Sequence, residues 1–314
     1  MKIAALAGGV GGAKLAQGLA RILGPDELSI IVNTGDDFEY LGLNISPDVD
    51  TVCYTIANMA NNSTGWGLKD ETFNVLKTLR QLNGPDWFRI GDSDLATHLI
   101  RTQKMKSGET LTNITHGFCQ LWGIKHKILP MSNDPVRTFV DTLEMGVLPF
   151  QEYFVKNHFE PHVKSFFFKG IESANPTEEV ISAIKKCDAV VICPSNPFVS
   201  VDPIISLNGI RQLLEEKYVI AVSPIIGKKA IKGPLAKMFL ELRIEPSISA
   251  IVDHYQEILD CIFIDEKDKG ELPLNDHSSI ILKTTNIMLP DIDSRIKLAA
   301  EIVEFVQEIQ PKKY

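Results

Sequence analysis

The first fifteen residues constrain the fold of this chain more than any other segment. An apolar run over 2–7 leads into a loop with four glycines in five positions, Gly8–Gly12, and a helical pattern begins at Leu15. This order of strand, glycine loop and helix is typical of the first unit of a doubly wound nucleotide-binding fold. Glycine lets backbone amides approach a phosphate closely, and the start of the following helix adds partial positive charge.

The glycine loop departs from both standard phosphate-binding patterns. It has two of the three glycines of a dinucleotide fingerprint but Lys14 at the third position, and it lacks the spacing and the Ser/Thr of a P-loop, since Leu15 follows Lys14. We expect the amides of Gly9, Gly11 and Gly12 to bind a phosphate, with Lys14 nearby. The alternative is a tight strand-to-helix turn that leaves Lys14 in solvent.

The order of the later segments predicts a mostly parallel sheet. An apolar strand over 29–33 completes a β-α-β unit, and alternation resumes near Pro176 with strands over 188–193 and 218–223 that each end in a Pro/Ser-rich loop. The intervening region has helical patterns, over 70–80, 93–101, 110–121 and 135–143. We therefore predict an α/β, Rossmann-like fold with helices on both faces of the sheet and a large, mainly helical insertion. Residues 1–60 and 174–314 are expected to form the nucleotide-binding core, and 61–173 an inserted substrate-binding region.

Charge and cysteine usage exclude several classes of protein. A net charge of −8 argues against broad nucleic-acid binding, which needs a basic surface. Five scattered cysteines without a CxxC pair indicate reduced thiols, so we expect a cytoplasmic protein. No apolar stretch approaches the ~18 residues of a membrane span, and the amino terminus lacks the layout of a signal peptide.

Three aspartates in the first fifty residues are candidates for ligand or metal binding. Asp36 follows the second strand, a position that fits ribose recognition as well as metal chemistry. Asp48 and Asp50 stand two residues apart beside Pro47, and in a turn they can converge on one Mg²⁺ ion. The alternative is that Asp50 caps the helical run that begins at Thr51.

A segment rich in aromatics begins at Trp87. Because Trp87 and Phe88 precede Arg89, they can stack a flat ring while the arginine binds an anion. The alternative is a packed loop in which Ser93 caps a helix and Asp94 lies in its first turn. A second aromatic group comprises Phe150, Tyr153 and Phe154. The default interpretation is that these rings pack in the core or at an interface.

Polar and basic residues follow two later strands. Ser195 and Asn196 come after the strand over 188–193, and Lys228 comes after the strand over 218–223. Open α/β sheets bind ligands at the carboxyl ends of their strands, so we expect all three residues to contact a nucleotide. For Lys228 and its basic neighbours, a solvated surface run is the alternative.

Five of these segments together resemble the 2-phospho-L-lactate transferase family, CofD, and in particular its archaeal, methanogen-type members. The resemblance covers essentially the whole chain, and the segments occur in family order. They are residues 7–14, 33–37, 46–51, 89–96 and 193–197.

The resemblance implies a specific reaction. Members of the family transfer a 2-phospholactyl group from lactyl-(2)-diphospho-(5′)-guanosine to the ribityl hydroxyl of the deazaflavin Fo (7,8-didemethyl-8-hydroxy-5-deazariboflavin), with Mg²⁺ required. GMP is released and coenzyme F(420)-0 is formed. By the same resemblance, Asp50 and Arg89 bind the deazaflavin, and the glycine loop with Ser195 and Asn196 binds the donor nucleotide.

The residues are compatible with direct displacement of the nucleotide. Such a reaction depends on alignment and charge neutralisation rather than a protein nucleophile, and no Ser/His/Asp or Cys/His arrangement is evident. We expect Asp50, with Asp48, to hold magnesium or orient the hydroxyl, and Arg89 to neutralise charge on phosphate oxygens. Trp87, Phe88 and the second aromatic group are candidates for an apolar wall beside the deazaflavin ring.

Two other functions are open from the sequence. One is a non-enzymatic regulator of the related fold that binds a nucleotide sugar, and the other is a nicotinamide-dependent oxidoreductase, which the glycine fingerprint alone suggests. For the transferase, the expected partners are small-molecule substrates and a second copy of the chain, with no nucleic acid and no membrane.

Overall fold

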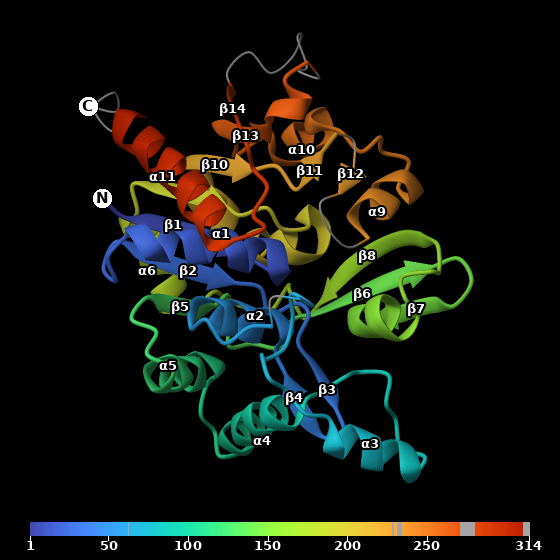
Figure 1. Cartoon of the computed structure of the whole chain (residues 1–314). Coiled ribbons are helices and arrows are strands. Elements are labelled where there is room, and N and C mark those ends of the chain that lie inside the picture. The colour runs from blue at the N-terminus through green and yellow to red at the C-terminus, as the bar shows by residue number, and fades with distance from the viewer. Residues whose placement is uncertain (62, 228, 231–233, 271–279, 310–314) are drawn as a thin grey trace.

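A seven-stranded parallel sheet forms the centre of the molecule in the computed structural model, which describes residues 1–61, 63–227, 229–230, 234–270 and 280–309 (Figure 1). The strand order is β5-β2-β1-β9-β10-β13-β14, and all the pairings are parallel. The direction of winding therefore reverses between β1 and β9, as in a doubly wound fold. The strands are β1 (Ile3–Ala7), β2 (Leu28–Val32), β5 (Lys127–Pro130), β9 (Ala189–Ile192), β10 (Tyr218–Val222), β13 (Cys261–Asp265) and β14 (Ile281–Thr285).

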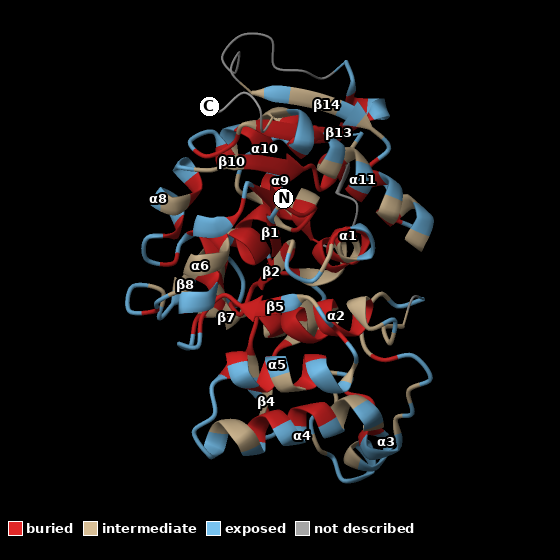
Figure 2. Ribbon diagram, turned by 90° about the vertical axis from the view of Figure 1, so that its left-hand side faces the viewer, coloured by how far each residue is buried: buried red, intermediate tan, exposed pale blue. Residues whose placement is uncertain are grey.

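Each face of the sheet has its own hydrophobic core. Ala4 and Leu6 of β1 point into one core and Ile3, Ala5 and Ala7 into the other, which is the two-residue period of a strand buried on both sides. The first core includes α6 (Glu178–Lys186), α7 (Asp202–Ile205), α8 (Ile210–Glu215), α9 (Leu235–Glu241) and α10 (Ile248–Tyr255). The second includes α1 (Gly9–Ile22), α2 (Pro47–Ile56) and α11 (Ile292–Ile309). Figure 2 shows these layers as a continuous buried interior, and the predicted α/β fold with helices on both faces is confirmed.

The region over 61–173 contains both helices and strands. Its helices are α3 (Asn74–Gln81), α4 (Asp92–Lys106) and α5 (Leu111–Leu121), and α4 packs against the hairpin of β3 (Phe38–Tyr40) and β4 (Leu43–Ile45). Strand β5 lies in the same region and pairs with β2 in the main sheet. By strand pairing, Lys127–Pro130 therefore belongs with the core rather than with an insertion. A strand of four residues gives little periodic signal.

The helical pattern over 135–143 was wrong as a prediction. These residues include β6 (Arg137–Thr142), which pairs with β7 (Gly146–Pro149) and β8 (Val163–Lys169) in an antiparallel sheet. Thr138, Val140 and Thr142 are buried in alternation, and their branched side chains suit a half-buried strand. Between β9 and β10 the chain forms two short helices, α7 and α8, and Gly209, with a φ of 75°, precedes the second.

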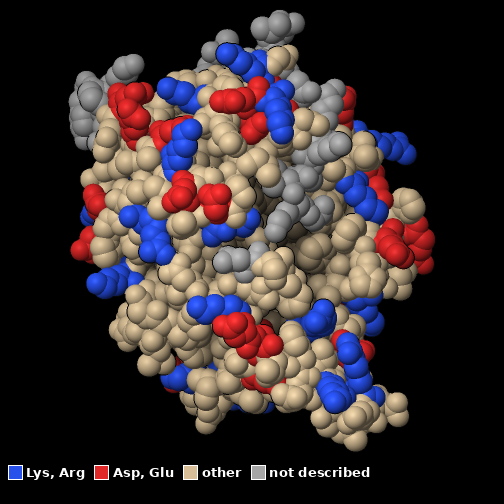
Figure 3. Space-filling model, viewed as in Figure 1, with Lys and Arg blue, Asp and Glu red and all other residues tan. Residues whose placement is uncertain are grey.

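The remaining described elements are short: β11 (Ile225–Ile226), β12 (Lys229–Ala230), the π-helical turns η1 (Glu152–Lys156) and η2 (Pro197–Val201), and the 3-10 turn η3 (Glu266–Asp268). Among the described helices, none combines the length and the apolarity that crossing a membrane requires. On the face shown in Figure 3, acidic and basic side chains are interspersed.

Candidate functional site

The glycine loop expected from the sequence forms the first turn of α1 from Gly9 onward, so the helix begins earlier than Leu15. This segment, for which we keep the name glycine loop, contacts the loop after β9 at the point where the sheet reverses its winding. The Ser195 hydroxyl donates to the Gly8 carbonyl at 2.8 Å and accepts from the Gly8 N–H at 3.2 Å. A Cβ on Gly11 would lie 2.2 Å from the Pro194 carbonyl oxygen, and one on Gly12 would lie 2.5 Å from the Ser195 hydroxyl. Close packing of the two loops is therefore one reason for these glycines, and the Ser195 hydroxyl holds the loops together.

This contact leads to a first prediction, for a Gly11→Ala variant. Because the Pro194 carbonyl is backbone and cannot rotate away, the added methyl group must separate the two loops, and we expect a loss of ~3 kcal/mol in the free energy of unfolding. Gly117→Ala in α5 is the matched control, since a Cβ there meets nothing within 4 Å and alanine favours the helix. Chemical denaturation measures both variants, and a Gly11→Ala variant as stable as Gly117→Ala would contradict the close packing.

Asp48 lies at the N-terminus of α1. The helix begins at Gly9, whose φ is 60°, and Gly8 before it provides no side-chain cap. The Gly9 N–H donates to the Asp48 carboxylate, which reaches it from the first turn of α2. A carboxylate at this end of a helix interacts favourably with the helix dipole. The position that suits an anion next to the glycine loop therefore has a carboxylate beside it.

Asp48 and Asp36 are linked through one amide. The Asn33 side-chain nitrogen donates to Asp48 at 2.9 Å and to Asp36 at 3.2 Å, and all three residues are buried. Burial raises the pKa of Asp48 to about 6, and burial together with the charge of Asp48 raises the pKa of Asp36 well above its usual value. Within the described part of the chain, neither carboxylate forms an ion pair. Two carboxylates so placed have the character of a cation site.

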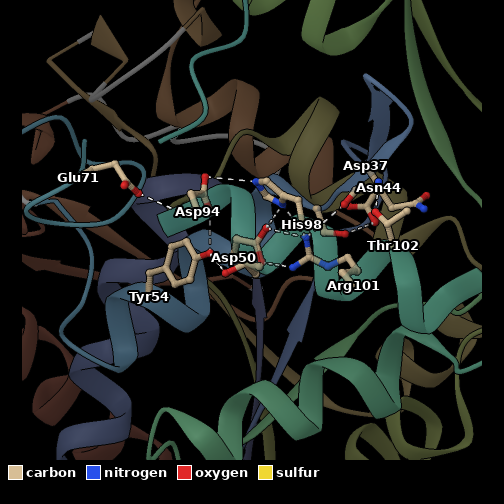
Figure 4. A network of polar contacts seen from close by, with 11 residues as sticks. Asp37, Asn44, Asp50, Tyr54, Glu71, Asp94, His98, Arg101 and Thr102 are labelled. Carbon is tan, nitrogen blue, oxygen red and sulfur yellow. Dashed lines mark hydrogen bonds and ion pairs between the residues drawn. The ribbon is translucent and has the colours of Figure 1, made fainter. Parts of the chain in front are cut away.

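Asp50 points away from Asp48. Both residues are in α2, and positions two apart on a helix do not face each other, so the predicted turn that brings both carboxylates onto one ion is replaced by a helix. Arg101 of α4 donates to both oxygens of Asp50, from Nη1 at 3.0 Å and from Nη2 in a shorter contact (Figure 4). The structure therefore puts the two aspartates in different sets of contacts.

Three further side chains complete the surroundings of Asp50. His98 Nδ1 lies 3.8 Å from Asp50, and His98 Nε2 lies 3.3 Å from Asp94, which also accepts a 2.7 Å hydrogen bond from the Tyr54 hydroxyl. Burial raises the pKa of Asp50, whereas Arg101 and His98 lower it. Asp50 raises the pKa of Arg101 against the effect of burial, so Arg101 stays charged. Asp50, Asp94 and His98 offer ligand atoms within 4.8 Å of one another, next to this guanidinium.

The start of α4 is fixed by side chains from the preceding loop. Glu71 accepts from the backbone N–H groups of Ser93 at 2.8 Å and Asp94 at 3.0 Å, and a Cβ on Gly91 would lie 1.8 Å from Glu71. The N-cap is Gly91, so the interpretation of Ser93 as the cap was wrong. Asp92 in turn accepts from the Thr72 hydroxyl and from the first N–H groups of α3, and these hydrogen bonds lower its pKa to about 2. The segment over 91–94 therefore anchors the helix that carries Asp94, His98 and Arg101.

The aromatic segment packs on the β3–β4 hairpin. Phe88 meets Phe38 with ring centroids 4.9 Å apart, and Trp87 meets Tyr40 at 5.2 Å. Phe38 and Tyr40 are absent from the sequence-based candidates, although their alternation around Glu39 after Asp37 is a strand signal. Arg89 is exposed, lies 5.1 Å above the Phe73 ring, and lines a cavity of about 460 Å³ with Phe73, Leu76, Lys77 and Arg80.

The remaining candidates have mixed surroundings. Phe150 and Tyr153 are buried in the first core, with Phe154 stacked on Phe150, which matches the default interpretation of that group. Lys14 is half-buried in α1. The Asn196 side chain accepts from the Phe198 N–H and contacts Met238 Sδ at 3.4 Å. Lys228 lies outside the described residues.

Asp37 leads to a prediction about pH. It accepts from Ser46 Oγ at 2.8 Å, and burial raises its pKa to about 7 although Arg137, Ser46 and Arg101 lower it. A pKa that is higher in the folded state means that the free energy of unfolding falls as pH rises through that pKa. Between about pH 5 and pH 8, the free energy of unfolding of Asp37→Asn should therefore fall by about 2 to 3 kcal/mol less than that of the wild type. Chemical denaturation of both proteins at both pH values tests this. An equal decrease in the free energy of unfolding in the variant and the wild type would contradict it.

A family model and several related proteins indicate the same family for this chain. Residues 3–304 match the family model described as 2-phospho-L-lactate transferase CofD. The chain is 41% identical over 266 residues to the 2-phospho-L-lactate transferase of Methanosarcina acetivorans, covering 85% of this chain and 86% of the relative. It is 38% identical over 306 residues to that of Methanocaldococcus jannaschii, with 96% and 97% covered. It is also 35% identical over 317 residues to the phosphoenolpyruvate transferase of Streptomyces griseus, with 99% and 100% covered.

A solved structure is similar in fold. A member of the UPF0052 family from Bacillus halodurans superposes with a TM-score of 0.63 at 17% identity, covering 96% of this chain and 98% of that one. At this identity, the likeness extends to the α/β fold alone.

Proposed function

The chain belongs to the 2-phospho-L-lactate transferase CofD family and is a transferase, and on this premise we propose that it transfers a 2-phospholactyl group from lactyl-(2)-diphospho-(5′)-guanosine to the ribityl hydroxyl of Fo. GMP leaves and coenzyme F(420)-0 forms. The observation that carries this proposal is that two aspartates of α2 have different surroundings. Asp48 lies beside the glycine loop and Asp50 lies beside Arg101 of α4.

We assign the donor to the edge of the sheet where β1 and β9 end. The N-terminus of α1 offers backbone amides and the positive end of a helix dipole, and this is the usual ligand position of a doubly wound sheet. Lys14, half-buried in α1, is the basic side chain of this end. These groups suit the diphosphate of a guanosine ligand.

The residues of this edge also fit Mg²⁺. Asp48 and Asp36 are hard oxygen ligands, both bonded to Asn33, and their raised pKa values reflect a burial that a divalent cation would offset. Asp50 is the poorer ligand because Arg101 donates to both of its oxygens. We therefore propose Asp48 with Asp36, rather than Asp48 with Asp50, for the metal. When bound there, Mg²⁺ neutralises charge on the diphosphate.

We assign the acceptor to the side of α2 that carries Asp50. A carboxylate has about four lone-pair positions, and two of them remain when a guanidinium fork occupies the others. Asp50 can therefore accept a hydrogen bond from the ribityl hydroxyl and align it for in-line attack, which is the main requirement of such a transfer. The partly buried rings of Trp87, Phe88 and Phe38 offer an aromatic surface to the deazaflavin ring. Exposed Arg89 offers positive charge.

The test is a reaction with defined substrates. Purified protein, Fo and Mg²⁺ are mixed with guanylylated 2-phospholactate or, separately, guanylylated phosphoenolpyruvate. We expect GMP and a heavier deazaflavin in equal amounts with the first donor. Faster turnover with the second donor would mean that the transferred group is phosphoenolpyruvyl rather than 2-phospholactyl. Binding of a UDP-sugar with no binding of Fo would support the regulator instead.

A further inference from the structure

Arg101 is the most deeply buried cation around the candidate acceptor side. Its relative exposure is 1%, and its guanidinium lies 5.8 Å from the Phe118 ring. Two of its N–H groups donate to the two oxygens of Asp50, so the fork sets both the distance and the rotation of that carboxylate. A surface arginine with the same charge would fix neither.

The arginine is itself held from several directions. His98 Nδ1 lies 3.1 Å from Arg101 Nη1, and His98 in turn contacts Asp94. Asp94, His98 and Arg101 follow one another at intervals of four and three residues, which puts them on one face of α4 toward α2 (Figure 4). Glu71 fixes the first turn of the same helix. A chain of contacts therefore runs from Glu71 through α4 to both Asp50 oxygens.

We infer that Arg101 is a positioning residue, which orients the free lone pairs of Asp50 toward the acceptor hydroxyl and thereby sets the turnover number. This inference rests on the proposed function. It assigns no contact between Arg101 and substrate: the guanidinium acts through Asp50. Displacing a reacting group by about 1 Å can cost about 100-fold in rate.

The experiment compares Arg101→Met and Arg101→Lys with Arg295→Met. Arg295 is also buried, and it donates to Gln17 Oε1 between α11 and α1, so its variant controls for the loss of a buried arginine. We expect Arg101→Met to lose about 100-fold in kcat with the KM for the guanosine donor within about threefold. Arg101→Lys, which keeps the charge without the fork, should recover part of the loss. Arg295→Met should keep kcat.

A double variant separates positioning from general damage. In an Asp50→Asn background, Arg101→Met should cause no further fall in kcat, because the group through which it acts is already altered. This double variant also removes both buried charges, so it serves if Arg101→Met alone does not fold. Wild-type kcat in both Arg101 variants, or a full further loss in the Asp50→Asn background, overturns the inference while the proposed function stands. A wild-type protein that forms no product overturns both.

Discussion

Asp50→Asn is expected to lower turnover by about 10³-fold while guanosine-nucleotide binding changes by less than about threefold. The amide removes the negative charge and puts an NH₂ group against one N–H of the Arg101 fork, so the two-point pairing with Arg101 is lost and only the two lone pairs of one oxygen remain as acceptors. It also leaves Arg101 buried without its counter-charge, which destabilises a folded protein. GMP release measures turnover, and calorimetric titration measures nucleotide binding.

The control for this variant is an ion-paired aspartate outside the site. Asp141 of β6 forms a 3.5 Å ion pair with Lys164 at the surface, so Asp141→Asn should keep turnover. Thermal melting of both variants shows whether lost turnover reflects lost structure. Near-wild-type turnover in folded Asp50→Asn would reject any role for this carboxylate in the transfer.

The sequence was sufficient for the central strands of the sheet and for the glycine segment that follows the first of them, but not for β5. Strands such as β1, β9 and β10 are apolar runs bounded by glycine, proline or serine, and their order along the chain implies parallel pairing. From the sequence, Gly11 is expected to bind phosphate. Its close approach to Pro194 is a second physical reason why this position needs a glycine. Local patterns were informative for these strands because each is an apolar run with its own boundary residues.

The candidate site depends on contacts that are distant along the chain. Arg101 pairs with Asp50, which is 51 residues away in the sequence. Within α4, Arg101 is one of several basic residues in a polar helix, so spacing alone gave no reason to select it. Asp48 and Asp50 are only two residues apart in sequence, yet the helix in whose first turn they lie separates their side chains. Pro47 in the first helical turn was a signal for this helix start.

Asp48→Asn is expected to abolish most of the Mg²⁺ dependence of the protein, with a fall of about 100-fold in turnover at a fixed Mg²⁺ concentration. The amide keeps the size of the side chain but removes the charge that the divalent cation requires. At about pH 8, the metal-free variant should melt at a higher temperature than the metal-free wild type, because burial raises the pKa of Asp48 to about 6 and its ionised form is unfavourable in the folded state.

Asp50→Asn is the matched comparison for this metal effect. Both aspartates are buried in the first turn of α2, but Arg101 is bonded to Asp50, whereas Asp48 shares Asn33 with Asp36. If the metal lies with Asp48, added Mg²⁺ should raise the melting temperature of wild type and of Asp50→Asn, but not of Asp48→Asn. The reverse pattern, with the increase kept in Asp48→Asn and lost in Asp50→Asn, would move the cation to the cluster of Asp50, Asp94 and His98. Arg101 would then have to release Asp50 when the ion binds.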